Sequence, residues 1–381
     1  MDDTIRVRGR LVLGDRVAMG SVTVEGRVIA SVSTDDGPID PHAPVLAPGF
    51  VDVHVHGWGG HDAMDDIDAL DGMARALLRH GVTSFLPTAV SAPLPALHRF
   101  ASNVRSWMAA APADGAEPLG FNLEGPFLAD ARRGAHDPTH LVDPADVSAT
   151  DLEPLMDGLR LITIAPEIPG AIDLITTLVA RGVVVSLGHS ASTLAEARAG
   201  YAAGATSTTH LFNGMGGVDH RAPGLAVAAL TTDGAWVELI ADGHHVHPGL
   251  WPLIVRAKPE GRLMLISDAS SLAGTEVGRA RIGNLDVEVV AGRVMLAGTT
   301  TLAGSIIALD DAVRNLVAAG VPLPTAFAAA SANPLRLLGV TDRGRLAAGQ
   351  AADMVELDGD LRVRRVMRGG HWYQNGRRAA G

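Results

Sequence analysis

The chain has 381 residues, 47% of them hydrophobic and 19% charged, so it is long enough to bury a large core. Its formal net charge of −11 argues against nucleic acid or an anionic membrane as a general partner. It has no cysteine, which excludes disulfides, thiolate metal sites and cysteine nucleophiles. The first fifteen residues are charged and hold no apolar segment typical of a signal peptide, and we expect a cytoplasmic protein.

The two ends of the chain share one pattern. Residues 5–33 and 343–377 both show short alternating stretches broken by Gly and Asp-Arg turns, without a long helical pattern. This pattern predicts a small β-sandwich domain formed from both termini, residues 1–48 and 343–381.

The central block, residues 49–342, alternates apolar runs of five to eight residues with longer amphipathic stretches. We predict strands at 50–56, 82–89, 118–124, 160–166, 183–189, 206–212, 236–242 and 263–268. Eight such βα units predict an α/β fold of the (β/α)8 TIM-like barrel type as the catalytic domain. An open doubly wound sheet is the alternative, but no GxGxxG turn follows the first strand.

Local signals place the helices between these strands. The stretch 192–204 opens with Thr193 and Glu196 in capping-box spacing. Glycines suited to a helix C-terminal cap recur at three helix-to-strand joints, namely Gly81, Gly182 and Gly204. Residues 270–302 form a long excursion in the eighth unit, and such additions at the ends of barrel strands usually shape an active site.

The first predicted barrel strand carries GFVDVHVHG, in which His54 and His56 share one face of the strand and the valines the other. Other polar residues that can bind a metal also follow apolar runs at the ends of predicted strands. The full set is His54, His56, Glu124, His189, His210 and Asp268. Singly, each has a structural interpretation as a hydrogen-bonded histidine or a cap. Together they fall at the barrel end where active sites are built.

Imidazole and carboxylate without thiolate suit Zn²⁺, Fe²⁺ or a similar ion with an open position for water. Such an ion lowers the pKa of water toward neutrality. Water activated in this way still needs a general base, and Asp268 at the last strand end can serve as one.

The motifs LEGPF, RRGAHDP, SLGHS, THLFNGM, ADGHHV and ISDAS, together with GFVDVHVHG, resemble the amidohydrolase superfamily. Within that superfamily they resemble the N-acetylglucosamine-6-phosphate deacetylase family, almost from end to end. Many amidohydrolases bridge two metals with a carboxylated lysine on strand 4. The only lysine of this chain, Lys258, lies between strands 7 and 8, so it cannot take that place. Glu124 is the candidate for that place.

The resemblance implies that Glu124, His189 and His210 form the main metal site and that His54 and His56 bind a second ion shared through Glu124. It implies one or two divalent metals per subunit, Zn²⁺ first, with Fe²⁺, Co²⁺ or Cd²⁺ as alternatives. Asp268 would be the general base and then the acid that protonates the amine. The expected reaction converts N-acetyl-D-glucosamine 6-phosphate to D-glucosamine 6-phosphate and acetate.

The resemblance also assigns substrate contacts. Arg221 and His245 match phosphate-binding positions, and one such residue reaching a neighbouring site implies a homodimer. His136 would contact a sugar hydroxyl, and Asn213 and Gly214 would offer polar loop contacts. The stretch 126–140 is a candidate lid.

Two alternatives stay open. One is a metal-dependent deacetylase or amidase for a different N-acyl compound. The other is a non-catalytic scaffold, although such relatives usually lose ligands that are present here.

Overall fold

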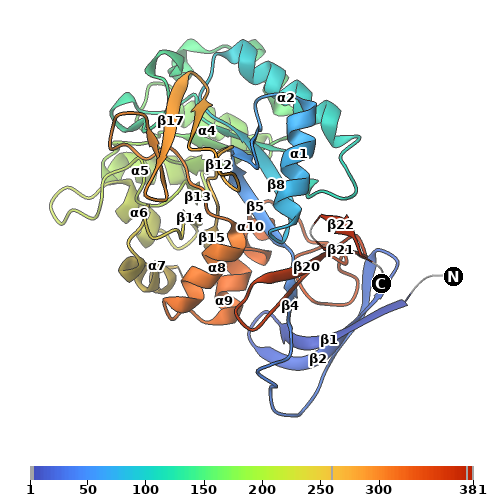
Figure 1. The fold of residues 1–381 in the computed structure, drawn as a ribbon. Coiled ribbons are helices and arrows are strands. Elements are labelled where there is room, and N and C mark those ends of the chain that lie inside the picture. The colour runs from blue at the N-terminus through green and yellow to red at the C-terminus, as the bar shows by residue number, and fades with distance from the viewer. Residues whose placement is uncertain (1–3, 259–260, 375, 380–381) are drawn as a thin grey trace.

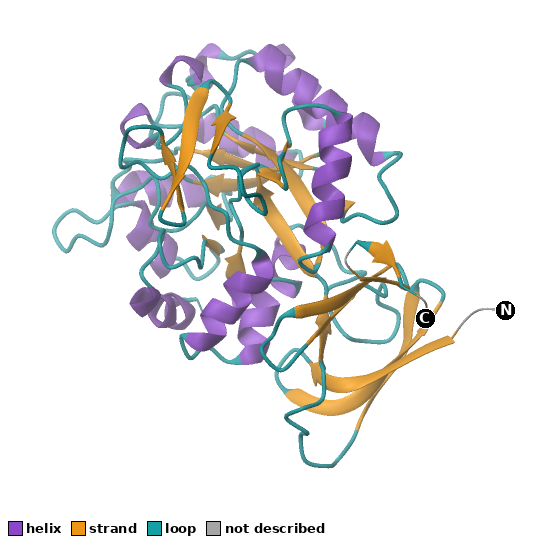
Figure 2. Ribbon diagram, viewed as in Figure 1, coloured by secondary structure: helices purple, strands orange, loops and turns teal. Residues whose placement is uncertain are grey.

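The computed structural model describes residues 4–258, 261–374 and 376–379, and its larger part is a barrel of parallel strands surrounded by helices (Figures 1 and 2). The barrel strands are β5 (Phe50–Val55), β8 (Val82–Ala89), β10 (Phe121–Glu124), β11 (Leu159–Ile164), β12 (Val184–Leu187), β13 (Ser207–Thr208), β14 (Val237–Leu239) and β15 (Leu263–Leu265). The helices that follow them in turn are α1 (Ile67–Leu78), α2 (Leu94–Met108), α3 (Ala149–Met156), α4 (Ala171–Ala180), α5 (Leu194–Ala202), α6 (Leu225–Thr231), α7 (Trp251–Ala257) and α8 (Leu309–Ala318).

Backbone hydrogen bonds close the barrel. Strands β5, β8, β10, β11, β12 and β13 pair in parallel in that order, and β14 pairs in parallel with β15. The two groups join where Leu211 N–H donates to Glu238 O (2.9 Å) and where Asp268 N–H donates to His54 O (2.9 Å). The predicted (β/α)8 fold is therefore confirmed, and the carboxyl ends of all its strands meet at one rim.

The predicted strands are found, but several end earlier than expected. His189, His210 and Asp268 each lie beyond the last residue of their strand, with φ of 46°, 24° and 49°. A non-glycine residue in this left-handed region has left the extended conformation. The predicted strands were too long because the apolar pattern in the sequence continues beyond the residue at which the backbone leaves the strand.

The helix starts and ends that the sequence predicts are also found in the structure. α5 begins after Thr193, whose Oγ1 accepts the N–H of Glu196 while the Glu196 carboxylate accepts the N–H of Thr193, so the capping box is formed. Gly81, Gly182 and Gly204 have φ of 84°, 80° and 110°, which is the conformation that ends a helix at little cost in glycine.

Both ends of the chain build one sheet beside the barrel. Its order is β22-β21-β20-β19-β4-β1-β2-β3, from β1 (Thr4–Val12), β2 (Val17–Glu25), β3 (Val28–Thr34), β4 (Val45–Pro48), β19 (Met354–Leu357), β20 (Val363–Arg368), β21 (His371–Gln374) and β22 (Arg377–Arg378). β4 pairs with both β1 and β19, so it joins the two tails. The sheet encloses its own apolar cluster, which includes Val22 from the first tail and Trp372 from the second.

The excursion after β15 forms a small three-stranded antiparallel sheet, β16 (Arg279–Ile282), β17 (Leu285–Val290) and β18 (Arg293–Leu296), which we call the flap. Figure 1 shows it in orange across the barrel from the terminal sheet. An apolar cluster including Val90, Ile282 and Ala303 packs the flap against the barrel. Short elements complete the fold: β6 (Gly57–Trp58), β7 (His61–Asp62), β9 (Glu117–Pro118), α9 (Leu323–Ala329) and α10 (Ala332–Leu337). None of the helices in the described ranges combines the length and hydropathy that crossing a membrane requires.

Candidate active site

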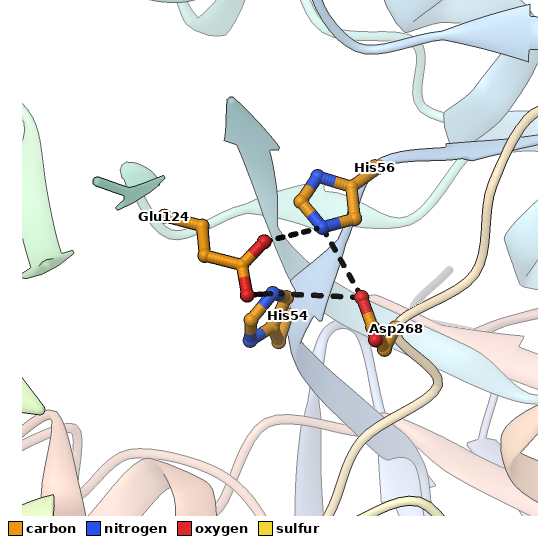
Figure 3. Close-up of side chains that lie close together, drawn as sticks. All are labelled: His54, His56, Glu124 and Asp268. Carbon is orange, nitrogen blue, oxygen red and sulfur yellow. Dashed lines mark ion pairs between the residues drawn. The ribbon is translucent and has the colours of Figure 1, made fainter. Parts of the chain in front are cut away.

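Strand β5 and the residue that follows it present two imidazoles, His54 and His56, to the barrel interior, because side chains alternate along a strand. His54 and His56 are both buried, at 0% and 5% exposure. Figure 3 shows them converging on Glu124 from β10 and on Asp268 from the loop after β15. His56 Nε2 lies 3.2 Å from a Glu124 oxygen and 3.1 Å from an Asp268 oxygen. His54 Nε2 lies 3.6 Å from each of the two carboxylates.

Glu124 also contacts the histidines of the opposite strands. Its Oε1 lies 2.9 Å from His189 Nε2 and 2.8 Å from His210 Nε2, and those two nitrogens lie 3.0 Å apart. Its Oε2 lies 3.2 Å from Nε2 of His136, in the loop after β10. The structure therefore brings together all six strand-end residues predicted from the sequence, with Glu124 at their centre.

The partner of Nδ1 decides which imidazoles can act as ligands. His54 Nδ1 donates to Glu238 (3.2 Å), His56 Nδ1 to Thr88 O (3.1 Å) and His189 Nδ1 to Arg132 O (2.8 Å). The Thr88 and Arg132 carbonyls can only accept, so Nδ1 carries the hydrogen in His56 and His189, and Nε2 is the ring atom that faces the cluster and can take a metal ion in place of a proton. This is the tautomer that binds a metal through Nε2.

His136 has the opposite tautomer. Its Nδ1 accepts the backbone N–H of Ser91 (3.2 Å), and a backbone N–H can only donate. Burial lowers the pKa of His136 to about 4, so the ring is neutral at neutral pH and its proton sits on Nε2. His136 is thus a hydrogen-bond donor toward the cluster, although its distances to Glu124 and His189 would also suit a ligand.

The electrostatics of the cluster favour a cation. Burial lowers the pKa of His54, but Glu124, Glu238 and Asp268 outweigh it and raise that pKa well above its usual value. Asp268 and Glu124 likewise overcome burial and raise the pKa of His56 to about 9. Burial opposes ionisation of Glu124, yet the surrounding imidazoles hold its pKa well below the usual range. The carboxylates thus hold positive charge among the rings, as protons or as a metal ion.

The donor set fits a divalent metal on this chain's own geometry. Nε2 of His54 is buried and has no hydrogen-bond partner within the described residues. His54, His56, Glu124 and Asp268 offer ligand atoms that all lie within 4.8 Å of one another, and all four are buried. Nitrogen and carboxylate donors at an open site are those of catalytic divalent ions.

A cavity of about 280 Å³ opens onto this cluster. Besides the cluster residues other than His54, it is lined by Asn213, Gly214 and His245, which the sequence analysis named as substrate contacts, and by Ala135 of the loop after β10. His245 is oriented by Asp242, whose carboxylate accepts its Nδ1–H at 2.7 Å. Burial opposes ionisation of Asp242, but the bonds from His245 hold its pKa below the ordinary value.

Arg221 is a predicted substrate-binding residue that the structure does not bring to this cavity. It lies in the exposed segment 217–222 between β13 and α6, where Val218 is 64% exposed. In Figure 1 the loop between β13 and α6 projects from the left side of the barrel. Its backbone N–H donates to the Asp219 carboxylate (2.7 Å), which shapes the loop.

Two features of the site were missed in the sequence. Glu238 lies on β14 with 0% exposure, bonded to His54 Nδ1 and to the backbone N–H of His210. A lone glutamate inside the apolar run AWVELIA was the available signal. The segment 300–304, which follows the flap, also lines the cavity. The excursion predicted an addition at the site, but not which residues would reach it.

Comparison with known proteins gives one consistent result. A model of the "Amidohydrolase family" matches residues 45–373. The chain is 39% identical over 356 residues to the N-acetylgalactosamine-6-phosphate deacetylase of Escherichia coli O157:H7, with 92% of each chain covered. It is 40% identical over 335 residues to the N-acetylglucosamine-6-phosphate deacetylase of Bos taurus, with 84% of this chain and 81% of the relative covered.

Solved structures agree. A mutant N-acetyl-D-glucosamine-6-phosphate deacetylase of Mycobacterium smegmatis, in complex with N-acetyl-D-glucosamine 6-phosphate, matches with a TM-score of 0.89 at 35% identity over 97% of this chain and 99% of that one. The N-acetylglucosamine-6-phosphate deacetylase of Thermotoga maritima matches with a TM-score of 0.90 at 32% identity, over 97% and 100% of the two chains.

Proposed function

The chain belongs to the amidohydrolase family, and on that premise we propose that it hydrolyses the acetamide of N-acetyl-D-glucosamine 6-phosphate to D-glucosamine 6-phosphate and acetate. The observation that carries the proposal is the convergence of four histidines and Asp268 around Glu124 at the wall of one cavity, which all of them except His54 line. The solved relative that holds this phosphorylated sugar supports the choice of substrate.

We propose that Glu124, His189 and His210 hold the main divalent ion and that His54 and His56 hold a second one. Three donor atoms of the first group lie within 3.0 Å of one another, which suits ligands of a single small cation. Zn²⁺ is our first choice, because this N/O donor set without thiolate is typical of catalytic zinc. When bound, such an ion polarises an amide carbonyl and lowers the pKa of water.

Asp268 is placed to move the proton. Burial opposes its ionisation, but His56 and His54 hold its pKa below the ordinary value, so it is a carboxylate at neutral pH. It takes a proton from the attacking water and returns it to the nitrogen that leaves as the amine. The water oxygen is transferred to the acetyl carbon as the carbon–nitrogen bond breaks, which balances the reaction.

His136, Asn213 and Gly214 orient the sugar. The Nε2–H of His136 is a donor whose hydrogen bond a sugar hydroxyl can accept. Asn213 donates through Nδ2 to His210 O (3.2 Å), so its amide is held at the cavity wall. At Gly214, where φ is 58°, a Cβ would approach His189 Nδ1 to 2.8 Å, and glycine leaves that ring its space.

We propose that His245 binds the phosphate from within the cavity and that Arg221 binds the phosphate in the cavity of a partner in a homodimer. Arg221 lies on an exposed segment that does not reach its own cavity, which is where a residue donated to a second subunit is expected. We keep the domain boundaries 1–48 with 343–381 and 49–342, the cytoplasmic location and the lid at 126–140 as predictions from the sequence.

The test is acetate release from N-acetylglucosamine 6-phosphate, with N-acetylgalactosamine 6-phosphate and unphosphorylated N-acetylglucosamine in parallel. We expect turnover of the first substrate that a chelator abolishes and Zn²⁺ restores. The galactosamine arm is needed because one relative at 39% identity carries that name. Activity that is indifferent to metal removal would contradict the proposed chemistry, and equal turnover with and without phosphate would contradict the substrate.

Arg221→Ala separates the phosphate assignment from the chemistry. We expect a strong rise in KM for the phosphorylated sugar and little change for the unphosphorylated one. If both substrates suffer equally, the assignment of Arg221 to the phosphate is wrong.

A further inference from the structure

Ser305, which follows the flap, is fastened to the loop that carries Asp268. Its N–H donates to Asp268 O (2.7 Å) and its Oγ donates to Ser267 O (2.6 Å). Its carbonyl accepts the N–H of Ser270 (3.0 Å), and its Oγ accepts the N–H of Ile307 (3.1 Å). Ser305 is only 2% exposed, so these bonds form away from competing water.

The backbone held in this way is left-handed at Asp268. Its φ is 49°, a region that few non-glycine residues occupy, and the bonds on both sides keep it there. Its N–H donates to His54 O (2.9 Å) on one side, and Ser305 supplies the bonds on the other. At Gly304 a Cβ would lie 2.8 Å from Asp268 O, so glycine permits the close approach of the two segments.

The residues just before Ser305 pair with the last strand of the flap. Leu296 N–H donates to Thr301 O (2.9 Å) and Ala303 N–H donates to Val294 O (3.0 Å), which adds residues 301–303 to the edge of β18. These residues line the cavity. One run of backbone hydrogen bonds therefore connects the flap, the cavity wall and the loop of Asp268.

We propose that Ser305 is a positioning residue for Asp268. It holds the peptide between Ser267 and Asp268 so that the Asp268 carboxylate stays beside His56, and it ties that alignment to the cavity wall formed by 301–303. This inference rests on the proposed function, in which Asp268 moves the proton.

The experiment compares Ser305→Ala and Ser305→Cys with a matched control, Ser331→Ala, in the metal-loaded enzyme. Ser331 is 1% exposed, and its Oγ donates to Phe327 O at 2.6 Å between α9 and α10, outside the cavity. For each variant kcat, KM, metal content and thermal unfolding are measured. We expect Ser305→Ala to lower kcat by on the order of ten-fold or more, with KM and metal content little changed, since small misplacements of a reacting group are costly.

Ser305→Cys keeps a weaker donor of similar size, and we expect its kcat to fall between those of the wild type and Ser305→Ala. Ser331→Ala should lose comparable stability and keep its kcat. A wild-type kcat in Ser305→Ala, or equal losses of kcat in Ser305→Ala and Ser331→Ala, would overturn the proposal. If Ser305→Ala does not fold, Ser305→Cys decides: a reduced kcat supports the role and an unchanged one overturns it.

Asp268→Asn, measured in parallel, separates this inference from its premise. If Asp268→Asn keeps wild-type activity, the assignment of the base fails, and the role of Ser305 fails with it. If Asp268→Asn is inactive while Ser305→Ala has the wild-type kcat, only the positioning role of Ser305 is wrong.

Discussion

The Oε2 atom of Glu238 accepts both the Nδ1–H of the His54 ring and the backbone N–H of His210, each at 3.2 Å. Glu238 is fully buried, and its other carboxylate oxygen has no hydrogen-bond partner in the described part of the chain. One carboxylate thus sets the orientation of one candidate ligand and the backbone position of another, across strands β5, β13 and β14.

We expect Glu238→Gln to weaken metal binding by about 10- to 100-fold, the usual effect of losing a carboxylate behind a ligating histidine. Competition with a chromophoric chelator measures the change. Glu153→Gln is the control, because Glu153 pairs with Arg181 on the exposed surface. Equal metal affinity in the two variants would show that Glu238 does not orient a ligand.

His136 and His189 are predicted to behave differently although their rings lie 4.7 Å apart. His189→Asn should lose metal, because Nε2 of His189 faces the cluster with its lone pair. His136→Asn should keep its metal and lose about 10²-fold in kcat/KM, because its Nε2 carries the proton it donates. Metal analysis of the two purified variants distinguishes them, and loss of metal from His136→Asn would refute the assigned tautomer.

Asp310 on α8 predicts an acid-sensitive element of stability. Burial raises its pKa, but His80 at 3.3 Å and Arg314 at 2.9 Å outweigh that effect and hold the pKa below the ordinary value of 3.8. Since the folded state binds this proton less readily than the unfolded state, the stabilisation is present above pH 3.8 and is lost as the pH falls through the lower folded-state pKa.

Asp310→Asn should therefore lower the free energy of unfolding by about 1–3 kcal/mol at neutral pH and should flatten its decline in acid. Urea unfolding at several pH values measures both effects. A decline in acid identical to that of the wild type would exclude Asp310 as its source.

Arg343 is predicted to fasten the returning C-terminal segment to the barrel. It is 12% exposed, donates to Glu117 (2.8 Å) and to Ser84 of β8 (3.2 Å), and lies 3.6 Å from Asp353. We expect Arg343→Ala to cost about 2 kcal/mol of unfolding free energy, because it leaves acceptors without their donor. Arg181→Ala, which removes an exposed ion pair, should cost clearly less stability in the same denaturation series.

Much of the fold was predictable because its signals are local. The spacing of Thr193 and Glu196 places a capping box, and a glycine such as Gly81 marks the end of a helix, whatever the rest of the chain does. The ends of the strands were predicted less accurately than the helices. The apolar pattern runs on toward His189 and His210, but their backbones turn out of the strand at positive φ.

The candidate site was predictable for a related reason. In a parallel barrel every strand ends at the same rim, so a polar residue that follows an apolar strand is placed near the others without any contact being known. That argument found Glu124, His54 and Asp268. It did not find Glu238 or Ser305, because neither follows the end of an apolar strand. The lone glutamate in AWVELIA marked Glu238 as unusual, but only the structure shows the partners that give each residue its role.

The sequence by itself determined the order of strands and helices, the rim at which imidazoles and carboxylates gather, and the kind of ion that such donors suit. Only the tertiary structure decided which ring nitrogen faces the cluster, since that depends on whether the atom beyond Nδ1 is a carbonyl, as for His189, or an N–H, as for His136. It also decided that Arg221 lies away from its own cavity. The physical reason is that alternation and capping act between neighbours in the chain, whereas His54 and Glu238 are 184 residues apart and meet only when the barrel closes.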